Sequence, residues 1–558
     1  MKPKRHRNLL FIASIGFFTL KFTAASAFGA DRVWTGLGGD DNWSTASNWS
    51  GGVLPVPDTD SLTFSGTTRQ SNNADLPFAY YLGITFSNGG FTISGPSNPG
   101  LRGDISSVGD NSINTYMYIA GGATRFINNS SGTLTLPAMD LQGATVQDNS
   151  SGTTVFGGTI TNIGLLRVFS TGQTVLGGDN SAYPGNIDVY RFAKLTHANG
   201  LGGASTTVTL DRSYDYAYID LNGLDVSGVN LSFTAAENPA STTVARLLNT
   251  NAAAASFGGN IALNYGGYFD CSGNVTLSGN ISGAGELSKF GGGTLTLSGN
   301  NSYTGITSVA NGILVITGDH TAATGSVFVN NGGSIAGTGP LGGNLTIQPG
   351  GRQSFAVAAT SGVQVARTIP GLLTLDAGHV LDLVAATTPA NGTYVLATAS
   401  GGIVGSIGTV ILTGLAGTVA ISGNSLILTV GGSPYSTWAN TFLPGNDVSN
   451  PAGDNDQDGL TNQQEFAFGL SPISGSSVNP ILVQLNKTTG QFSYQRRASS
   501  GLTYKILTST SLTAGSWTHD VGATQVTGAT DGNGNQIVVV TLTGPLPASK
   551  LFVRVAAE

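Results

Sequence analysis

The stretch that decides the fold is ISGAGELSKFGGGTLTLSGNNSYTGITSVANGILVI, residues 281–316. It alternates short runs of β-forming residues with corners of glycine and asparagine. The run at residues 275–277 (VTL) returns at 295–297 (LTL) twenty residues later, and the run that ends at Ile316 follows nineteen residues after that. A repeat of this length with its strands in phase predicts a solenoid, in which each turn buries its inner face against its neighbours.

The same stretch carries a family resemblance. Its residues meet the pattern G-x-G-x-L-x-K, G-G-T-L-x-L-x-G, N-x-Y-T-G and V-x-x-G-x-L, and the matching positions are Gly283, Gly285, Leu287, Lys289, Gly292, Gly293, Thr294, Leu295, Asn301, Tyr303, Thr304, Gly305, Val309, Gly312 and Leu314. In these motifs the chain resembles the autotransporter-associated β-strand repeat of secreted bacterial proteins. The resemblance implies a right-handed parallel β-helix and export, and it implies no catalytic residue.

The composition extends this prediction to most of the chain. Glycine contributes 82 of 558 residues, and charged residues make up only 9% while hydrophobic residues make up 40%. A disordered chain would be poorer in apolar residues, so an all-β fold of many short strands is indicated. We expect residues 28–432 to form a long parallel β-helix of about 20 residues per coil, with an N-terminal cap.

A second return sharpens the expected register. The sequence NSSGT occurs at residues 129–133 and again at 149–153. Stacked turns would then place Asn129 over Asn149, where side-chain amides can form a hydrogen-bonded ladder.

The amino terminus has the features of a signal peptide at residues 1–27. Basic residues precede an apolar run at residues 9–20, and Ala25-Ser26-Ala27 provides the small-x-small pattern that a signal peptidase needs. The apolar run is shorter than the roughly 20 residues of a membrane span. We therefore expect export, to the medium or the cell surface, with no membrane span after signal removal.

The charge of the exported chain bears on its partners. Loss of the signal peptide removes five basic residues and no acids, which takes the formal charge from −7 to −12. Nucleic acid is therefore not an expected partner, because its binding depends on basic surfaces. An extracellular surface or a polysaccharide remains possible as a partner, and the oligomeric state stays open.

Three of the five tryptophans lie close together at the start of the expected mature chain: Trp34, Trp43 and Trp49. An open-ended solenoid must shield its first turn from water, and large aromatic side chains folded over that end would do so. The alternative is an exposed platform on which sugars stack.

A tyrosine-rich segment, DRSYDYAYID at residues 211–220, is a second candidate site. Alternate residues of a strand point to the same face, so its tyrosines could form a row that stacks on a glycan. The bland alternative is an ordinary outer face with Ala217 and Ile219 turned into the core. The candidate residues are Tyr214, Tyr216 and Tyr218 for glycan contact, and Asp211, Asp215 and Asp220 as acids among which a catalytic pair could be formed.

The composition changes after Gly431-Gly432, and residues 433–478 are expected to form a calcium-binding segment. Ser433 can cap a helix that Pro434 opens and Pro444 ends. The helix would carry an apolar face of Tyr435, Trp438, Ala439 and Phe442.

The loop that follows, DNDQDGLTNQQE at residues 454–465, fits D-x-[DN]-x-[DN]-G-x5-E. A hard cation takes six to eight oxygens, and Gly459 permits the bend that brings them together. The expected Ca²⁺ ligands are Asp454, Asp456, Asp458, the carbonyl of Leu460, Asn462 and Glu465. No lysine or arginine between residues 433 and 478 could neutralise these acids instead.

The segment resembles EF-hand and dockerin-type loops, present here once. The alternative is a solvated acidic loop. Thr461 and Gln464 have capping-box spacing, and Gly469 with Pro472 is expected to end the second helix.

Residues 479–558 alternate again but lose the 20-residue count. They predict a small antiparallel β-sandwich, with Asp531-Gly532-Asn533-Gly534 as a hairpin turn. The expected strands lie at residues 481–485, 491–497, 503–509, 525–528, 537–542 and 551–555.

The sequence offers little for catalysis. It has no H-E-x-x-H, G-x-S-x-G or phosphate-loop motif, and the single cysteine, Cys271, is expected to be a small buried residue. The expected function is that of an exported, non-catalytic structural or adhesive surface protein with a calcium-stabilised junction. One alternative is a glycan-binding module. The other is a polysaccharide lyase or hydrolase, which fold analogy alone would suggest, and fold does not give function.

Overall fold

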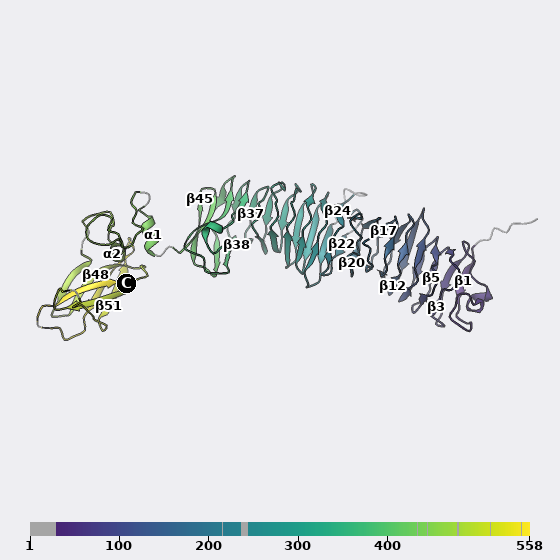
Figure 1. Cartoon of the computed structure of the whole chain (residues 1–558), viewed down its shortest axis with the longest axis horizontal. Coiled ribbons are helices and arrows are strands. Elements are labelled where there is room, and N and C mark those ends of the chain that lie inside the picture. Colours follow the sequence, from purple (N-terminus) through teal and green to yellow (C-terminus); the bar gives the residue numbers. More distant parts are fainter. Residues whose placement is uncertain are drawn as a thin grey trace, which may run out of the picture. The chain divides into compact units, whose positions relative to one another are not determined.

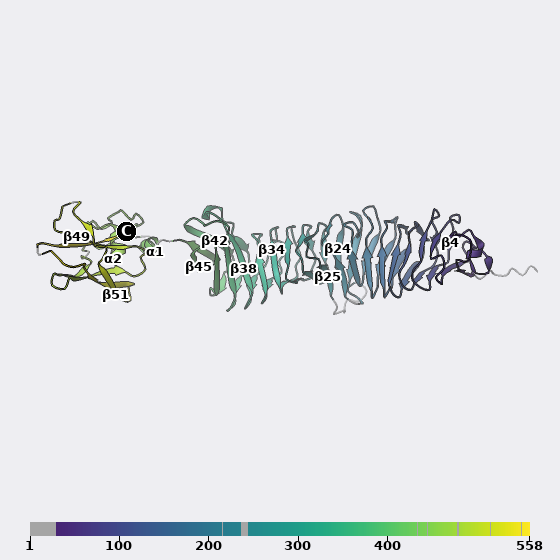
Figure 2. The same ribbon diagram turned by 90° about the horizontal axis from the view of Figure 1, so that it is seen from below.

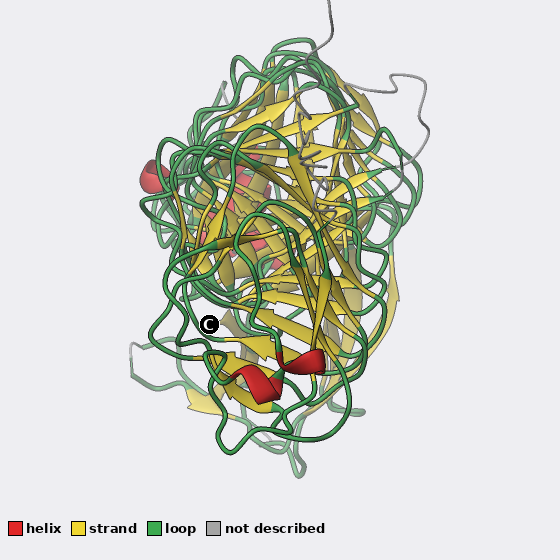
Figure 3. Ribbon diagram, turned by 90° about the vertical axis from the view of Figure 1, so that its right-hand side faces the viewer, coloured by secondary structure: helices red, strands yellow, loops and turns green. Residues whose placement is uncertain are grey.

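A computed structural model describes residues 29–558, except 215, 236–243, 432–433, 443–444, 477–478, 514 and 548. The expected signal peptide, residues 1–27, lies outside the described residues. Helix makes up 4% of the structure, and Figure 3 shows how far strands dominate it. The chain divides into two compact units, Met1–Val327 and Phe328–Glu558.

The strands stack as a parallel β-solenoid of about 13 turns with a spacing of about 21 residues, and successive turns follow one another in Figure 1. The repeats that predicted this fold are in register. Leu277 of β29 (Val275–Leu277) pairs with Leu297 of β32 (Thr294–Leu297), which pairs with Ile316 of β34 (Gly312–Ile316). All three side chains are buried, so the predicted all-β solenoid is confirmed.

The strands of the amino-terminal unit stack in three columns, and most turns give one strand to each column. The first column is a sheet of β1 (Asp31–Trp34), β2 (Ser61–Phe64), β5 (Ile84–Phe86), β8 (Ile105–Ser107), β11 (Thr124–Asn129), β14 (Thr145–Asp148), β17 (Leu165–Val168), β19 (Asn186–Val189), β21 (Thr207–Asp211), β24 (Asn230–Thr234), β27 (Ile261–Leu263) and β30 (Ile281–Ser282).

The second column contains β3 (Ser71–Asn73), β6 (Thr92–Ser94), β9 (Asn111–Ile113), β12 (Thr133–Leu136), β15 (Thr153–Phe156), β18 (Gln173–Leu176), β20 (Phe192–Leu195), β22 (Ala217–Asp220), β25 (Ala245–Asn249), β28 (Gly267–Cys271), β31 (Leu287–Phe290) and β33 (Thr307–Val309).

The third column is divided into two sheets. The earlier one, which we call the five-stranded sheet, contains β4 (Tyr80–Tyr81), β7 (Gly100–Leu101), β10 (Met117–Ile119), β13 (Met139–Asp140) and β16 (Ile160–Thr161). The later one contains β23 (Asp225–Val226), β26 (Ala255–Phe257), β29, β32 and β34. Strand β4 is labelled in Figure 2.

The first turn is closed by the three tryptophans. Trp34, Trp43 and Trp49 are each at most 1% exposed. Trp34 and Trp49 meet edge to face with their centroids 5.2 Å apart, and Phe64 of the next turn packs against all three rings. Because these rings are buried, the alternative of an exposed sugar platform is wrong here.

The expected ladder of Asn129 over Asn149 is also wrong. In this turn the first-column strands pair with a shift of 21 residues, Ile127 with Asp148, whereas the second-column strands pair with a shift of 20, Thr133 with Thr153. The backbone N–H of Asn129 therefore donates to the Ser150 hydroxyl, and its side-chain amide donates to the carbonyls of Gly132 and Thr153. Between these paired positions the earlier turn has one more residue than the later turn, so Asn129 lies beside Ser150 and not beside Asn149.

The carboxy-terminal unit begins with further solenoid strands, most of them parallel. They are β36 (Gly333–Ala336), β37 (Leu345–Ile347), β38 (Arg352–Val357), β39 (Arg367–Ile369), β40 (Leu373–Leu375), β41 (Val380–Ala385), β42 (Gly392–Ala399), β43 (Ile403–Gly405), β44 (Thr409–Thr413), β45 (Gly417–Ser422) and β46 (Ser425–Val430).

The last of these strands do not continue the parallel coil that the sequence predicted. β46 pairs antiparallel with both β42 and β45. Only Gly423 and Asn424 separate β45 from β46, which is too short for a circuit of the solenoid but suits a two-residue hairpin.

Two antiparallel sheets complete this unit. They contain β47 (Ile481–Asn486), β48 (Gln491–Arg497), β52 (Asn535–Thr541) and β51 (Thr524–Thr530), and β50 (Thr518–His519), β49 (Tyr504–Ser509) and β53 (Phe552–Ala557). Side chains from both sheets share one core, so the predicted sandwich is confirmed. The turn at residues 531–534 joins β51 to β52, where the Asp531 carboxylate accepts from the backbone of Asn533 and Asn535.

Burial of the repeat leucines predicts where the solenoid is sensitive to substitution. Leu297→Ala should lower the free energy of unfolding by about 2–5 kcal/mol, because it leaves a cavity between two packed turns. Thr296→Ala, one residue earlier on the outward face, should change it by about 0.5 kcal/mol or less. Urea unfolding with hydrogen exchange across residues 275–316 measures both. Equal effects of the two variants would contradict the inward placement of Leu297.

Candidate metal centre

Two short helices frame the predicted calcium loop. They are α1 (Pro434–Asn440) and α2 (Asn462–Phe468). Trp438 and Ala439 of α1 pack with Val448 and with Phe466 of α2 in a small buried cluster. Pro434 opens α1 as predicted, whereas Ser433 and Pro444 lie outside the described residues.

The helix pair is docked on the sandwich. The Arg497 guanidinium lies 5.1 Å from the ring centre of Phe466, and its Nε donates to the Phe466 carbonyl at 3.0 Å. The Tyr504 hydroxyl donates to the carbonyl of Ala467 at 2.7 Å. Figure 2 shows α1 and α2 beside the sandwich strands. The expected calcium segment is therefore part of the same packed body as residues 479–558.

Helix α2 begins and ends as the sequence predicted. Thr461 is its N-cap, and the Thr461 and Gln464 side chains form the reciprocal capping box. Gly469 ends the helix with φ of +67°, and its N–H donates to the carbonyls of Glu465 and Phe466. The capping box fixes the start of α2 at the end of the loop before it, and the glycine cap ends the helix.

The loop before α2 is closed by the carboxylate of Asp454. One of its oxygens accepts from the backbone N–H of Asp458 at 3.2 Å, and the other accepts from Gly459 at 2.9 Å. Gly459 has φ of +92°, a conformation that favours glycine, so the predicted bend is present.

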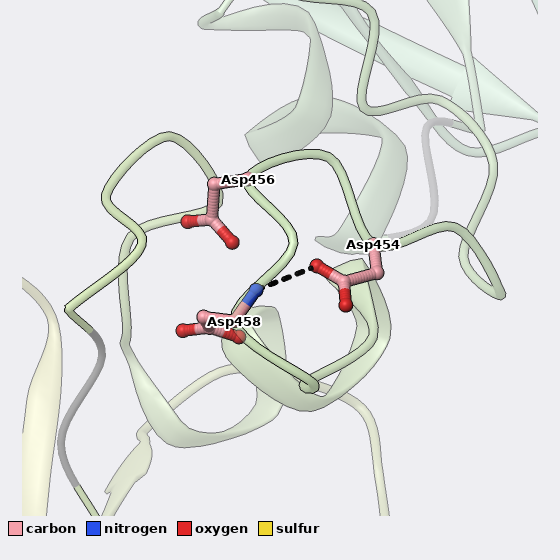
Figure 4. A group of neighbouring side chains, drawn as sticks. All are labelled: Asp454, Asp456 and Asp458. Atoms are coloured by element: carbon pink, nitrogen blue, oxygen red, sulfur yellow. Dashed lines mark hydrogen bonds between the residues drawn. The ribbon is translucent and has the colours of Figure 1, made fainter.

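The bend brings three acids together. Ligand oxygens of Asp454, Asp456 and Asp458 all lie within 4.8 Å of one another, and Figure 4 shows the three side chains around one space. Both carboxylate oxygens of Asp456 are out of contact with solvent, and no described residue donates a hydrogen bond to them. A buried carboxylate without a donor is costly. A cation at this point would remove that cost, so the donor set fits Ca²⁺.

The other expected ligands lie at the start of α2 or just before it. Asn462 is buried, and its side-chain NH₂ donates to the Asn450 carbonyl at 2.9 Å. The N–H of Leu460 donates to Asp458 at 2.8 Å. Glu465 is fully buried on α2 but is not one of the three acids whose ligand atoms meet within 4.8 Å. Burial raises the pKa of Tyr435, and the charge of Glu465 raises it further.

The tyrosines at residues 214–218 do not form one row. Only Tyr218 lies in strand β22, because that strand begins at Ala217. Tyr214 packs with Phe169 and Tyr190, whereas Tyr216 stacks on Tyr218 with centroids 5.9 Å apart. Ala217 and Ile219 are buried, as expected for an ordinary strand whose other side chains face outward. Glycan contact here stays a prediction.

The two described acids of the same segment are buried and hydrogen-bonded. The buried Asp211 accepts hydrogen bonds from the backbone and the hydroxyl of Ser213. The buried Asp220 accepts from the backbone of Asn222 and from the backbone and hydroxyl of Thr250 in the next turn. Asp215 lies outside the described residues.

The single cysteine is a core residue. Cys271 is fully buried in β28, and burial raises the pKa of its thiol to about 12. A thiol with so high a pKa is protonated at neutral pH and is a poor nucleophile.

One aromatic cluster was missed by sequence reasoning. Phe78, Tyr80 and Tyr118 meet on the five-stranded sheet although 40 residues separate the first from the last. The only signal was the recurrence of tyrosine at matching positions of the third column, and the 20-residue count is unclear in this part of the sequence.

Comparison with known proteins supports the repeat. Residues 287–316 match the family model described as passenger-associated-transport-repeat. The match covers 30 of 558 residues and lies within the stretch that predicted the solenoid. No curated protein matches this chain. In the described part of the chain, no helix has the length and apolar character that a membrane crossing needs.

Proposed function

We propose that this protein is an exported, passenger-like surface protein that acts as a structural or adhesive scaffold. The observation that carries the proposal is the passenger-associated-transport repeat at residues 287–316, set within a parallel β-solenoid. A solenoid presents long outward faces whose side chains are not needed for packing, and such faces suit contact with other surfaces. The expected signal peptide at residues 1–27 supports the route outward.

The proposed role is non-catalytic. Polysaccharide lyases and hydrolases need acids that converge on the substrate. The acids that the sequence offered for this, Asp211 and Asp220, are buried, and their carboxylates accept hydrogen bonds from neighbouring backbone and hydroxyl groups. These hydrogen bonds are a sufficient reason for the two acids to be present, so a catalytic role is not needed to explain them.

We further propose that Asp454, Asp456 and Asp458 hold Ca²⁺, with the Leu460 carbonyl, Asn462 and Glu465 as the remaining ligands. The support is the unpaired buried carboxylate of Asp456 inside the acid cluster. Because α2 packs on the sandwich through Phe466 and Ala467, the ion would tie the loop to that body. Calcium would thus stabilise the region between the last solenoid strands and the sandwich.

Calcium binding can be tested on the full chain. Ca²⁺ at a free concentration of about 100 times its Kd should raise the unfolding free energy of the carboxy-terminal body by about 2.7 kcal/mol. Asp456→Asn should abolish this gain, because it removes the charge while keeping the side-chain size. Asp447→Asn is the matched control, since Asp447 is an exposed acid in the same segment. Calorimetric titration and thermal unfolding measure the effect.

Limited proteolysis shows which part of the chain Ca²⁺ stabilises. EDTA should increase cleavage between residues 445 and 475 and leave the solenoid fragment intact. No heat of binding at millimolar Ca²⁺, or an equal loss in both variants, would reject the site.

Export can be tested by adding protease to intact cells that express the chain. The full chain should be degraded, whereas a variant without residues 1–27 should be protected together with a cytosolic marker. Protection of both forms would contradict the surface role.

The non-catalytic role predicts that the purified protein leaves pectin, alginate and xylan chains at their original length. Size-exclusion chromatography of the polysaccharides before and after incubation measures this. The non-catalytic proposal would be wrong if the protein shortened a polysaccharide and Asp211→Asn or Asp220→Asn abolished that activity without changing the circular dichroism spectrum. The protein would then be an enzyme.

A further inference from the structure

The outward face of the five-stranded sheet carries an aromatic pocket that is distinct from the metal centre and from the tyrosines at residues 214–218. Within this sheet Tyr80 of β4, Gly100 of β7 and Tyr118 of β10 stand in register on successive strands. The two tyrosines are therefore two turns apart and flank a glycine. Both tyrosines line the pocket.

The rings around this space form a continuous group. Phe78 meets Tyr80 edge to face at 5.3 Å and meets Tyr118 edge to face at 5.2 Å. Tyr118 meets Tyr116 at 5.2 Å. Phe78 is 56% exposed, a large apolar ring that folding has not covered. Its exposure costs free energy in the unbound protein.

Gly100 makes the arrangement possible. A Cβ at this position would lie 2.4 Å from the Tyr80 ring, so any larger residue would push that ring away. The Arg102 guanidinium lies 4.9 Å from the centre of the Tyr80 ring and also binds Asp58 at 2.7 Å. The Tyr80 ring is thus held against the next turn, at Gly100 and Arg102, and not by burial in the core.

A polar group is held beside the rings. The Tyr80 hydroxyl donates to the Gln142 side-chain oxygen at 2.8 Å, and no described residue accepts from the Gln142 side-chain nitrogen. Gln142 has φ of +46°, which is uncommon outside glycine. The carboxylate of Asp140 supports this turn, because it accepts from the Gln142 backbone at 3.0 Å and from the Asn162 side chain.

The pocket has a volume of about 550 Å³, within the range of small-ligand sites. It is lined by Phe78, Tyr80, Pro96, Ser97, Asn98, Tyr118 and Gln142. None of these side chains is charged. The lining combines aromatic rings with amide groups that can both donate and accept hydrogen bonds.

We propose that this pocket binds a neutral oligosaccharide. The C–H face of a pyranose ring carries partial positive charge and stacks on the negative face of an aromatic ring, while its hydroxyls pair with side-chain amides. The uncharged lining favours a neutral sugar over a uronate. An acidic protein and an uncharged pocket also disfavour a nucleic acid. The proposal rests on the proposed surface role, to which it adds a ligand class.

The test uses the purified full chain and calorimetric titration with hexasaccharides of glucose, mannose, galactose and xylose in their neutral polymer linkages. We expect at least one to bind, and Phe78→Ala or Tyr118→Ala to weaken it about tenfold, in line with the loss of one stacking contact. Gly100→Ala should weaken binding as well, because it displaces the Tyr80 ring without removing an aromatic. Circular dichroism controls for folding, and both Phe78 and Tyr118 are accessible side chains.

Tyr216→Ala is the matched control, since Tyr216 is an exposed tyrosine of a later turn. If Tyr216→Ala alone abolished binding, the sugar site would lie at Tyr216 and the proposal for the aromatic pocket would be wrong. Binding of none of the hexasaccharides at millimolar concentration would also overturn it, and binding of decaproline instead would identify a proline-rich peptide groove. Because these experiments use purified protein, they can fail while export is confirmed, or succeed while it is not.

Discussion

The hydrogen bonding of each turn to the next is the constraint on which the rest of this structure depends. A solenoid turn has no core of its own, and its backbone groups must pair with those of its neighbours to avoid buried, unsatisfied polar atoms. Even buried cations serve this purpose. The Nζ of Lys289 donates to the carbonyls of Phe290 and Gly291 and to Asn311 of the next turn. In the other unit, the guanidinium of Arg367 donates to three carbonyls at residues 336–339. Burial lowers the pKa of both groups.

How much the sequence could predict follows from how regular this pairing is. Where corners keep one length, the inward residues return at a fixed count, so Leu277, Leu297 and Ile316 can be aligned by counting along the chain. A corner that is one residue longer shifts the partner, as with Asn129, although the motif still looks periodic. The hairpin at residues 423–424 did have a local signal, a Gly-Asn pair between two alternating runs. The long repeat before it outweighed that signal.

The calcium loop was predictable for a different reason. Its residues are adjacent in sequence, and a local spacing fixes which side chains can converge. Only the surroundings required the structure. The sequence placed α2 beside the loop, but the docking of Phe466 under Arg497 joins residues far apart in the chain. Because of this docking, a cation that orders the loop would also order the helix that packs on the sandwich. The metal centre and the sandwich core should then respond to calcium as one body.

The aromatic pocket illustrates the reverse case. Inward positions of a solenoid are restricted by the turns on either side, whereas outward positions are not, so they can vary without loss of the fold. Sites built on outward positions therefore break the period that makes the fold visible in the sequence. Phe78, Tyr118 and Gln142 come from three different turns and share no motif. What joins them is the register of β4, β7, β10 and β13, with Gly100 leaving room for the ring of Tyr80. The periodic positions that predict the fold therefore carry little information about the outward positions, where a binding site can form. In this chain an exposed phenylalanine, a glycine whose replacement would displace a tyrosine ring and a glutamine at positive φ lie together at one such place.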